Sequence, residues 1–320
     1  MTDDSGLRIA TRSSELALRQ ARLVADALGA RGTPSTLVTF RTTGDRNTEK
    51  PLGAIGAKGL FTHELETALL KRRVDCCVHS LKDLPTEMPE GLAIAAILER
   101  EDPRDVLVVN DAIAAEGIAD LPRGSRVGTS SLRRRAQLRH ARPDVEVVEL
   151  RGNVPTRLRK VDDGQVHAAI LAAAGLHRLG VHQRIDAYLA PPDWLPAPGQ
   201  GAIAVQVRAA DDAVRGLIAP LDHAPTSCAT RAERAFLAAL EGGCQVPIGA
   251  LVMEQEGAFV LHGMLSDVAG RRVLRGSTVI DRADPERAGA QLAAELREQG
   301  ADAILAGLRG EETVPAPQPE

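Results

Sequence analysis

Residues 78–85 read Val78-His79-Ser80-Leu81-Lys82-Asp83-Leu84-Pro85, and our expectations for the fold start from them. A mostly apolar run from Val74 to Val78 ends in a cluster of polar and ionisable side chains, and Pro85 then stops regular structure. A buried parallel strand delivers functional groups to a ligand crevice at its carboxyl end in this way. The pattern therefore predicts an α/β protein with a binding crevice at this strand end.

Asp83 is the informative member of this stretch, because the other strand ends that we predict supply mainly cations. On its own the carboxylate fits three roles: metal ligand, salt-bridge partner or base. We expect the surrounding chain to hold a polyanion around it. A salt bridge is the weaker interpretation if the arginines are committed to that ligand.

The composition is that of an ordinary globular protein. The chain has 320 residues, 44% of them apolar and 26% charged, which suits two or three domains. No apolar segment approaches the ~20 residues that cross a bilayer, and no secretory signal is visible at the start. Four cysteines give no disulfide framework, so we expect a cytoplasmic, reducing compartment and no membrane contact.

The charged residues favour a small anionic ligand over a nucleic acid. Only five of the 39 cationic residues are lysine, so 34 are arginine, while the formal net charge is −4. Aromatic residues make up 2% of the chain, too few for the stacking platforms of single-strand binders. Genomic base composition explains part of the arginine excess, but it does not choose where the arginines stand.

Arginines follow several predicted strands. The strand 126–128 leads through Thr129-Ser130-Ser131 into a helix that begins with Arg133 and Arg134, which is a suitable anion cradle. Successive helical residues point about 100° apart, so we expect these two arginines at the ligand and Arg135 in solvent. Further members of the same pattern are Arg12 with Ser14 after strand 7–10, Arg151 and Arg157 after strand 145–150, and Arg178 after strand 168–171. At the first of these strand ends, an ordinary helix cap by Ser13 or Ser14 with Arg12 in solvent is the simpler explanation.

Two irregular, proline-containing connections, at 99–105 and 191–201, bracket an inserted α/β unit. We therefore expect two lobes joined by a pair of crossovers, with the ligand between them. A small α+β unit follows. The predicted domains are 1–103 plus 201–220, then 104–200, then 221–310, with a disordered tail at 311–320.

Three local patterns look like ligand motifs but lack the spacing. Lys58 lies in a glycine-rich loop over 51–61, yet a glycine follows it where a P-loop needs Ser or Thr. His63-Glu64 opens like a zinc helix, but Thr67 stands where the second histidine belongs. Residues 199–204 match a dinucleotide fingerprint but enter a strand rather than a helix. We predict no metal and no dinucleotide, and interpret 51–61 as a mobile loop.

Seven motifs, in this order along about 300 residues, resemble the porphobilinogen deaminase (hydroxymethylbilane synthase) family. They are Lys58–Phe61, Val78–Asp83, Glu101–Asp105, Gly128–Arg134, Leu150–Asn153, Pro198–Gly201 and Glu241–Ile248. The resemblance implies three α/β domains, the first two like a periplasmic binding protein, with mixed sheets and two crossovers. It also implies a transferase of porphyrin (heme) biosynthesis that condenses four porphobilinogens head to tail into hydroxymethylbilane, with loss of ammonia.

The resemblance assigns residue roles that the spacing alone does not. It implies a dipyrromethane cofactor joined by a thioether to Cys244, a residue for which the sequence alone leaves an exposed thiol and a packed one equally open. It implies that Asp83 stabilises azafulvenium cations and handles protons. Cofactor contacts are expected from Lys82, Ser80, Thr129, Ser130, Ser131, Arg133, Arg134 and Gly152. Substrate contacts are expected from Arg12, Ser14, Arg151, Arg157, Arg178 and Gln200, with Lys58 and Phe61 in the loop.

The family often has a second lysine before Lys58, where this chain has Ala54, so any anion contact of that lysine is lost or falls to Lys58. We expect a monomer whose product passes to uroporphyrinogen-III synthase. Two other classes remain as alternatives. A non-catalytic two-lobed anion-binding protein explains the lobes and arginines but not Asp83 or the loop thiol. A nucleic-acid-binding module is opposed by the net charge and the scarce aromatics.

Overall fold

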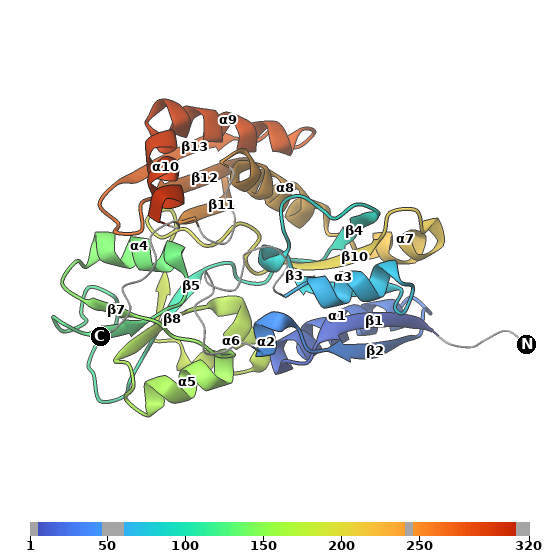
Figure 1. Ribbon diagram of the computed structural model, residues 1–320, viewed down its shortest axis with the longest axis horizontal. Coiled ribbons are helices and arrows are strands. Elements are labelled where there is room, and N and C mark those ends of the chain that lie inside the picture. The colour runs from blue at the N-terminus through green and yellow to red at the C-terminus, as the bar shows by residue number, and fades with distance from the viewer. Residues whose placement is uncertain (1–5, 47–60, 241–245, 312–320) are drawn as a thin grey trace, which may run out of the picture.

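The computed structural model describes residues 6–46, 61–240 and 246–311. These residues form two five-stranded sheets and one three-stranded sheet, each covered by helices (Figure 1). No helix among the described residues is long and apolar enough to cross a membrane. The mixed α/β architecture agrees with the predicted fold class.

The first sheet has the strand order β2-β1-β3-β10-β4. Its strands are β1 (Leu7–Arg12), β2 (Ser35–Phe40), β3 (Cys76–Ser80), β4 (Leu92–Ile97) and β10 (Ile203–Arg208). Its helices are α1 (Glu15–Gly29), α2 (Thr43–Arg46), α3 (His63–Leu70), α7 (Asp212–Ile218) and the 3₁₀ turns η2 (Leu81–Asp83) and η4 (Ala219–Leu221). The strand before Asp83, expected as parallel, is parallel to β1 but antiparallel to β10.

The second sheet repeats this layout with the order β7-β6-β8-β5-β9. Its strands are β5 (Asp105–Val109), β6 (Arg126–Gly128), β7 (Glu146–Val148), β8 (Ala168–Ala172) and β9 (Ala187–Leu189). Its helices are α4 (Leu132–Ala141), α5 (Val154–Asp162), α6 (Ala173–Leu179) and the 3₁₀ turn η3 (His182–Arg184). In both sheets three parallel strands adjoin an antiparallel strand that enters from the other lobe.

This topology brings the functional segments to facing edges. The strands β1, β2 and β3 are parallel, so their carboxyl ends share one edge of the first sheet. The strands β6, β7 and β8 do the same in the second sheet. The crossover after β4 enters β5, and the crossover after β9 enters β10, so both connections start and finish at these edges.

Several of the helices that follow these strand ends begin with side-chain caps, of which the sequence suggested the one after β1. The Ser14 hydroxyl accepts a hydrogen bond from the Ala17 N–H at the start of α1. Ser131 caps α4 through the Arg134 N–H, and Asn153 caps α5 through the Thr156 N–H. Each cap fixes a helix N-terminus, with its free N–H groups, beside the shared edge.

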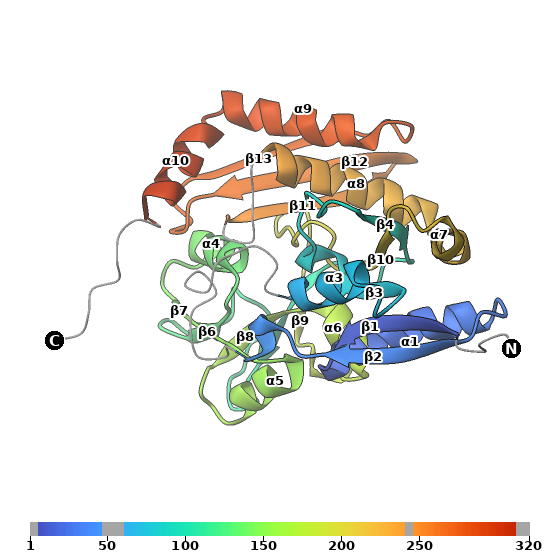
Figure 2. The ribbon, with the colours of Figure 1, turned by 45° about the vertical axis from the view of Figure 1, so that its right-hand side comes forward.

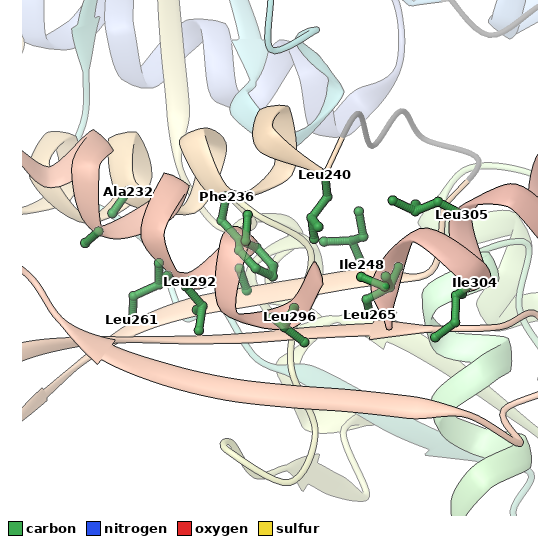
Figure 3. Packing of buried hydrophobic residues seen from close by; sticks show 14 of the residues in the cluster. Ala232, Phe236, Leu240, Ile248, Leu261, Leu265, Leu292, Leu296, Ile304 and Leu305 are labelled. Carbon is green, nitrogen blue, oxygen red and sulfur yellow. The ribbon is translucent and has the colours of Figure 1, made fainter. Parts of the chain in front are cut away.

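The third unit packs helices on one face of a small antiparallel sheet (Figure 2). It consists of α8 (Ala224–Ala239), β11 (Ile248–Gln255), β12 (Ala258–Ser266), β13 (Val273–Val279), α9 (Pro285–Glu298) and α10 (Ala301–Glu311). Phe236, Leu292 and Leu296 are fully buried between the layers (Figure 3). Gly289 lets α9 approach α8, because an added Cβ would collide with the Ala232 carbonyl oxygen. Burial of each of these large side chains stabilises the fold by ~1.5–3 kcal/mol, so this core holds the helices against the sheet.

Glu233, which is fully buried on α8, joins this unit to both crossovers. Its carboxylate accepts from Arg100 at 2.6 and 3.0 Å and from the Gly199 N–H at 2.7 Å. It also accepts from the Val252 N–H of β11 at 2.9 Å. A buried carboxylate with four such donors fixes the crossovers against the third unit.

Candidate functional site

Asp83 and Arg12 meet at the carboxyl edge of the first sheet, where β3 and β1 end. They line a small, partly open pocket. Gln20, Phe61, His79 and Ser80 line the same pocket, with Ala17 and Val78. Four of the residues predicted for the site, Arg12, Phe61, Ser80 and Asp83, are therefore brought together.

Asp83 has a cationic neighbour, which makes the salt-bridge interpretation stronger than the sequence indicated. The Arg12 Nη1 atom lies 3.9 Å from the Asp83 Oδ2 atom, and the two side chains are 24% and 32% exposed. At that distance and exposure an ion pair contributes little to stability. The Arg12 guanidinium also stacks 4.2 Å above the Phe61 ring, which holds it beside the carboxylate. Asp83 thus remains available to a ligand.

Hydrogen bonds between buried polar groups hold the side chains that line the pocket in place. The Gln20 side chain of α1 exchanges hydrogen bonds with the Ser80 hydroxyl at 2.8 and 3.2 Å. The His79 ring bonds to the Gln206 amide oxygen at 3.0 Å, and the Gln206 amide nitrogen donates to Glu66 at 3.2 Å. Burial lowers the pKa of His79 to about 4, so this imidazole stays neutral near pH 7.

The second sheet presents the hydroxyl cradle that its sequence predicts, although its hydroxyls bond locally in this structure. The Thr129 hydroxyl accepts from the Ser131 N–H at 3.1 Å, and Ser130 donates to the Leu150 carbonyl at 2.6 Å. Gly152 adopts φ +115°, and an added Cβ would press on Thr156. The turn after β7 therefore requires glycine at this position.

Arg133 and Arg134 do lie together at this edge, but both bind a carboxylate of the protein itself. Arg133 donates to Asp105 at 2.6 Å and Arg134 donates to it at 2.7 Å. Trp194 and Gln200 also donate to Asp105, each at 2.8 Å. Burial alone would raise the pKa of Asp105, but the two arginines hold it far below its ordinary value. This buried cluster ties β5 to α4 and to the second crossover.

Lys82 is a cation without a close carboxylate partner among the described residues. Its Nζ atom donates to the Gln200 amide oxygen at 3.2 Å. Burial lowers the pKa of Lys82 to about 8, Arg134 adds to the shift, and Asp83 and Asp105 oppose it. Gln200 thus bridges Lys82 and Asp105, two ionised groups from different lobes.

The positive charges of Arg157 and Arg178 likewise have no carboxylate within ion-pair distance among the described residues. Burial lowers the pKa of Arg157 to about 10, with Arg134 and Arg151 adding to the shift. Burial likewise lowers the pKa of Arg178 to about 10, and its guanidinium donates to the Gly201 carbonyl at 2.7 Å. Within the described residues, four buried guanidinium Nε atoms lack a hydrogen-bond partner: those of Arg133, Arg134, Arg157 and also Arg135, which was expected in solvent. These residues fit a ligand that carries several carboxylates.

Three residues named from the sequence lie outside the described residues: Lys58, Ala54 and Cys244. The sequence reasoning gave no role to Asp105, Gln20 or His79. Asp105 could have been identified from the sequence, because a carboxylate that opens the apolar run 106–109 must be paired when it is buried. Gln20 could have been identified too, since it interrupts the buried stripe of α1.

The chain matches two family models. One, described as the dipyromethane cofactor binding domain of porphobilinogen deaminase, covers residues 7–216. The other, described as the C-terminal domain of porphobilinogen deaminase, covers residues 227–298. Among solved structures, the methionine binding protein MetQ is similar with a TM-score of 0.44 and 12% identity, covering 73% of this chain and 94% of that chain.

Two curated relatives extend this similarity along nearly the whole chain. Porphobilinogen deaminase from Syntrophobacter fumaroxidans is 50% identical over 304 residues, or 94% of this chain and 97% of the relative. The protein of the same name from Moorella thermoacetica is 50% identical over 307 residues, or 95% and 97%. The carboxylate pocket, the uncompensated arginines and these matches agree, and the chain belongs to the porphobilinogen deaminase family.

Proposed function

We propose that Asp83 is the carboxylate that serves the reaction of this family, the condensation of porphobilinogen into hydroxymethylbilane. Loss of ammonia from the substrate leaves a methylene-azafulvenium cation, which a pyrrole α-carbon attacks. A carboxylate beside the pyrrole N–H groups stabilises that cation and accepts the proton that is released after the attack. The observation that supports this role is the half-buried Asp83 in a partly open pocket, whose ion pair within the described part of the chain is the long one to Arg12.

The dipyrromethane cofactor supplies the pyrrole α-carbon to which the first substrate is joined. We propose that Cys244 attaches it through a thioether. Its acetate and propionate groups would be held by the Lys82 ammonium, the hydroxyls of Ser80, Thr129, Ser130 and Ser131, and the guanidinium groups of Arg133 and Arg134, with Gly152 giving room. The unpartnered Nε atoms of both arginines support this assignment.

The incoming substrate would be held at its carboxylates by arginines from several strand ends. The residues we assign to it are Arg12, Ser14, Arg151, Arg157, Arg178 and Gln200, with Lys58 and Phe61 from the loop. The lowered pKa values of Arg157 and Arg178 support the assignment, because a bound carboxylate would offset the burial of each cation.

The organisation around this site is part of the proposal. Residues 1–103 with 201–220, 104–200 and 221–310 would form the three domains, with 311–320 as a tail. The enzyme would act as a cytoplasmic monomer and pass its product to uroporphyrinogen-III synthase.

Intact-mass spectrometry tests the cofactor assignment directly. The wild-type protein is expected to be heavier than its sequence by one dipyrromethane, and Cys244→Ser is expected to have the mass of the sequence alone. Cys228→Ser is the matched control, since Cys228 lies on α8 and should leave the added mass in place. An added dipyrromethane that persists in Cys244→Ser would contradict the attachment.

A further inference from the structure

Arg234 on α8 reaches from the third unit to the turn that follows Asp83. Its guanidinium donates to three consecutive backbone carbonyls, those of Leu84 at 3.2 Å, Pro85 at 2.6 Å and Thr86 at 3.4 Å. Asp83 is the residue immediately before these three. A side chain of one domain therefore holds the backbone beside the carboxylate of another.

This contact is unusual in its electrostatics. Burial lowers the pKa of Arg234 to about 10, and no other group contributes to the shift. Within the described residues no acidic side chain lies within ion-pair distance of Arg234. Three neutral carbonyls are weaker compensation for a partly buried cation than a carboxylate would be. The arginine guanidinium carries five N–H donors in a planar fork, so it can bind several carbonyls of one turn at once. A shorter side chain, or one with a single donor, cannot do this.

Its neighbour Glu233 makes the anchoring rigid. Glu233 binds Arg100 and the Gly199 N–H, one from each crossover, and the Val252 N–H of β11. The dipeptide 233–234 thus fixes three segments of the site region to one helix: the Asp83 turn and both crossovers. The chain continues from α8 towards Cys244.

We propose that Arg234 is a positioning residue that sets the Asp83 carboxylate relative to α8. It touches no substrate in this account and acts through the backbone of 84–86. A misplacement of about 1 Å at a reacting group can reduce a rate by ~10²-fold, so removing three hydrogen bonds next to Asp83 should mainly affect kcat. The proposal rests on the role we assign to Asp83.

The test compares kcat and KM for porphobilinogen in Arg234→Met and Arg234→Lys, with intact mass and Tm for each. Arg234→Met should lower kcat by ~10- to 100-fold while KM changes less than about threefold, because the arginines that hold substrate carboxylates are untouched. Arg234→Lys should recover part of kcat, since one ammonium can still donate to one or two of the carbonyls. The dipyrromethane mass should persist in both variants.

Two controls separate positioning from stability. Arg231→Met removes an exposed arginine of the same helix, paired with Glu286 at 2.6 Å, and should leave kcat unchanged. Leu292→Ala should lower Tm through the core of the third unit without touching the Asp83 turn. A wild-type kcat in Arg234→Met would overturn the proposal. The proposal would also be overturned if Leu292→Ala lost as much kcat as Arg234→Met when the two variants have the same Tm. If Asp83→Asn, assayed alongside, keeps wild-type kcat, the failure lies in the role of Asp83 instead.

Discussion

Asp83 and Asp105 stand at corresponding edges of two sheets with the same strand order, yet their environments differ. Asp105 is fully buried and accepts from two arginines, a tryptophan and a glutamine. Asp83 is 32% exposed, and its ion-pair partner among the described residues, Arg12, lies 3.9 Å away. A carboxylate whose acceptor sites are all filled is committed to the fold. One whose sites are open can meet a cation that appears only during a reaction.

The comparison also explains where the arginines are free to act. Asp105 satisfies one end of Arg133 and Arg134 but leaves their Nε atoms without partners in the described structure. Arg157 and Arg178 have no carboxylate within ion-pair distance in the described structure, and burial lowers the pKa of each although Glu149 and Glu101 oppose the shift. The strand ends of the second lobe therefore carry several arginines, two of which are held by the buried Asp105 carboxylate.

Replacing Asp105 should produce the largest loss of stability. Asp105→Asn leaves two buried arginines without their counter-charge, so the free energy of unfolding should fall by ~3–5 kcal/mol. Urea unfolding followed by fluorescence measures this, since the single tryptophan, Trp194, bonds to Asp105. Glu286→Gln, in an exposed pair with Arg231, is the control and should cost less than ~1 kcal/mol. If both substitutions lowered the free energy of unfolding by the same amount, Asp105 would not be the structural carboxylate that we describe.

The ionisation of Lys82 should change the free energy of unfolding less than the replacement of Asp105 does. Without a ligand its pKa is lowered to about 8, so the ammonium is charged below pH 8 and lost above it. The buried charge destabilises the fold below pH 8, and this penalty disappears as the pH rises from 8 towards the ordinary value of ~10.4. A cofactor carboxylate beside it should raise the pKa.

Acylation by a mass tag measures this, because the chain has only five lysines. In cofactor-free Cys244→Ser, labelling of Lys82 should reach half its maximum near pH 8. In the wild-type protein the midpoint should move to higher pH, with the exposed Lys71 as the reference amine. The same midpoint in both proteins would argue against a carboxylate at Lys82.

Much of this fold followed from strand-and-helix periodicity. The strands before Arg12, Asp83 and Arg178 were predicted within about two residues, and the helix cap considered at Ser14 stands at the start of α1. The strand 248–255 was missed because Gly249 and Ala250 interrupt its apolar alternation. The strand 187–189 and the helix 301–311 were also not predicted. The pairing of β3 with β10 was beyond the sequence, since it depends on a chain that returns from the other lobe.

Within the site, residue types were easier to predict than partners. The sequence indicated that arginines gather at strand ends, and the parallel pairing of β6, β7 and β8 brings them to one edge. It did not indicate that Asp105 would bind two of them, because that contact joins residues 28 and 29 positions apart. The Arg12–Asp83 pair depends likewise on β1 and β3 being neighbours. The family match sets aside the two non-enzymatic alternatives.

The most direct test of the role of Asp83 is kcat of Asp83→Asn on protein whose intact mass includes the dipyrromethane. Loss of a charge that stabilises a developing cation should lower kcat by ~10²- to 10³-fold, or about 3–4 kcal/mol in the barrier. Tm should change little, because Asp83 is partly exposed and its ion pair is long. A kcat within about threefold of the wild type, with the cofactor mass present, would contradict the assignment.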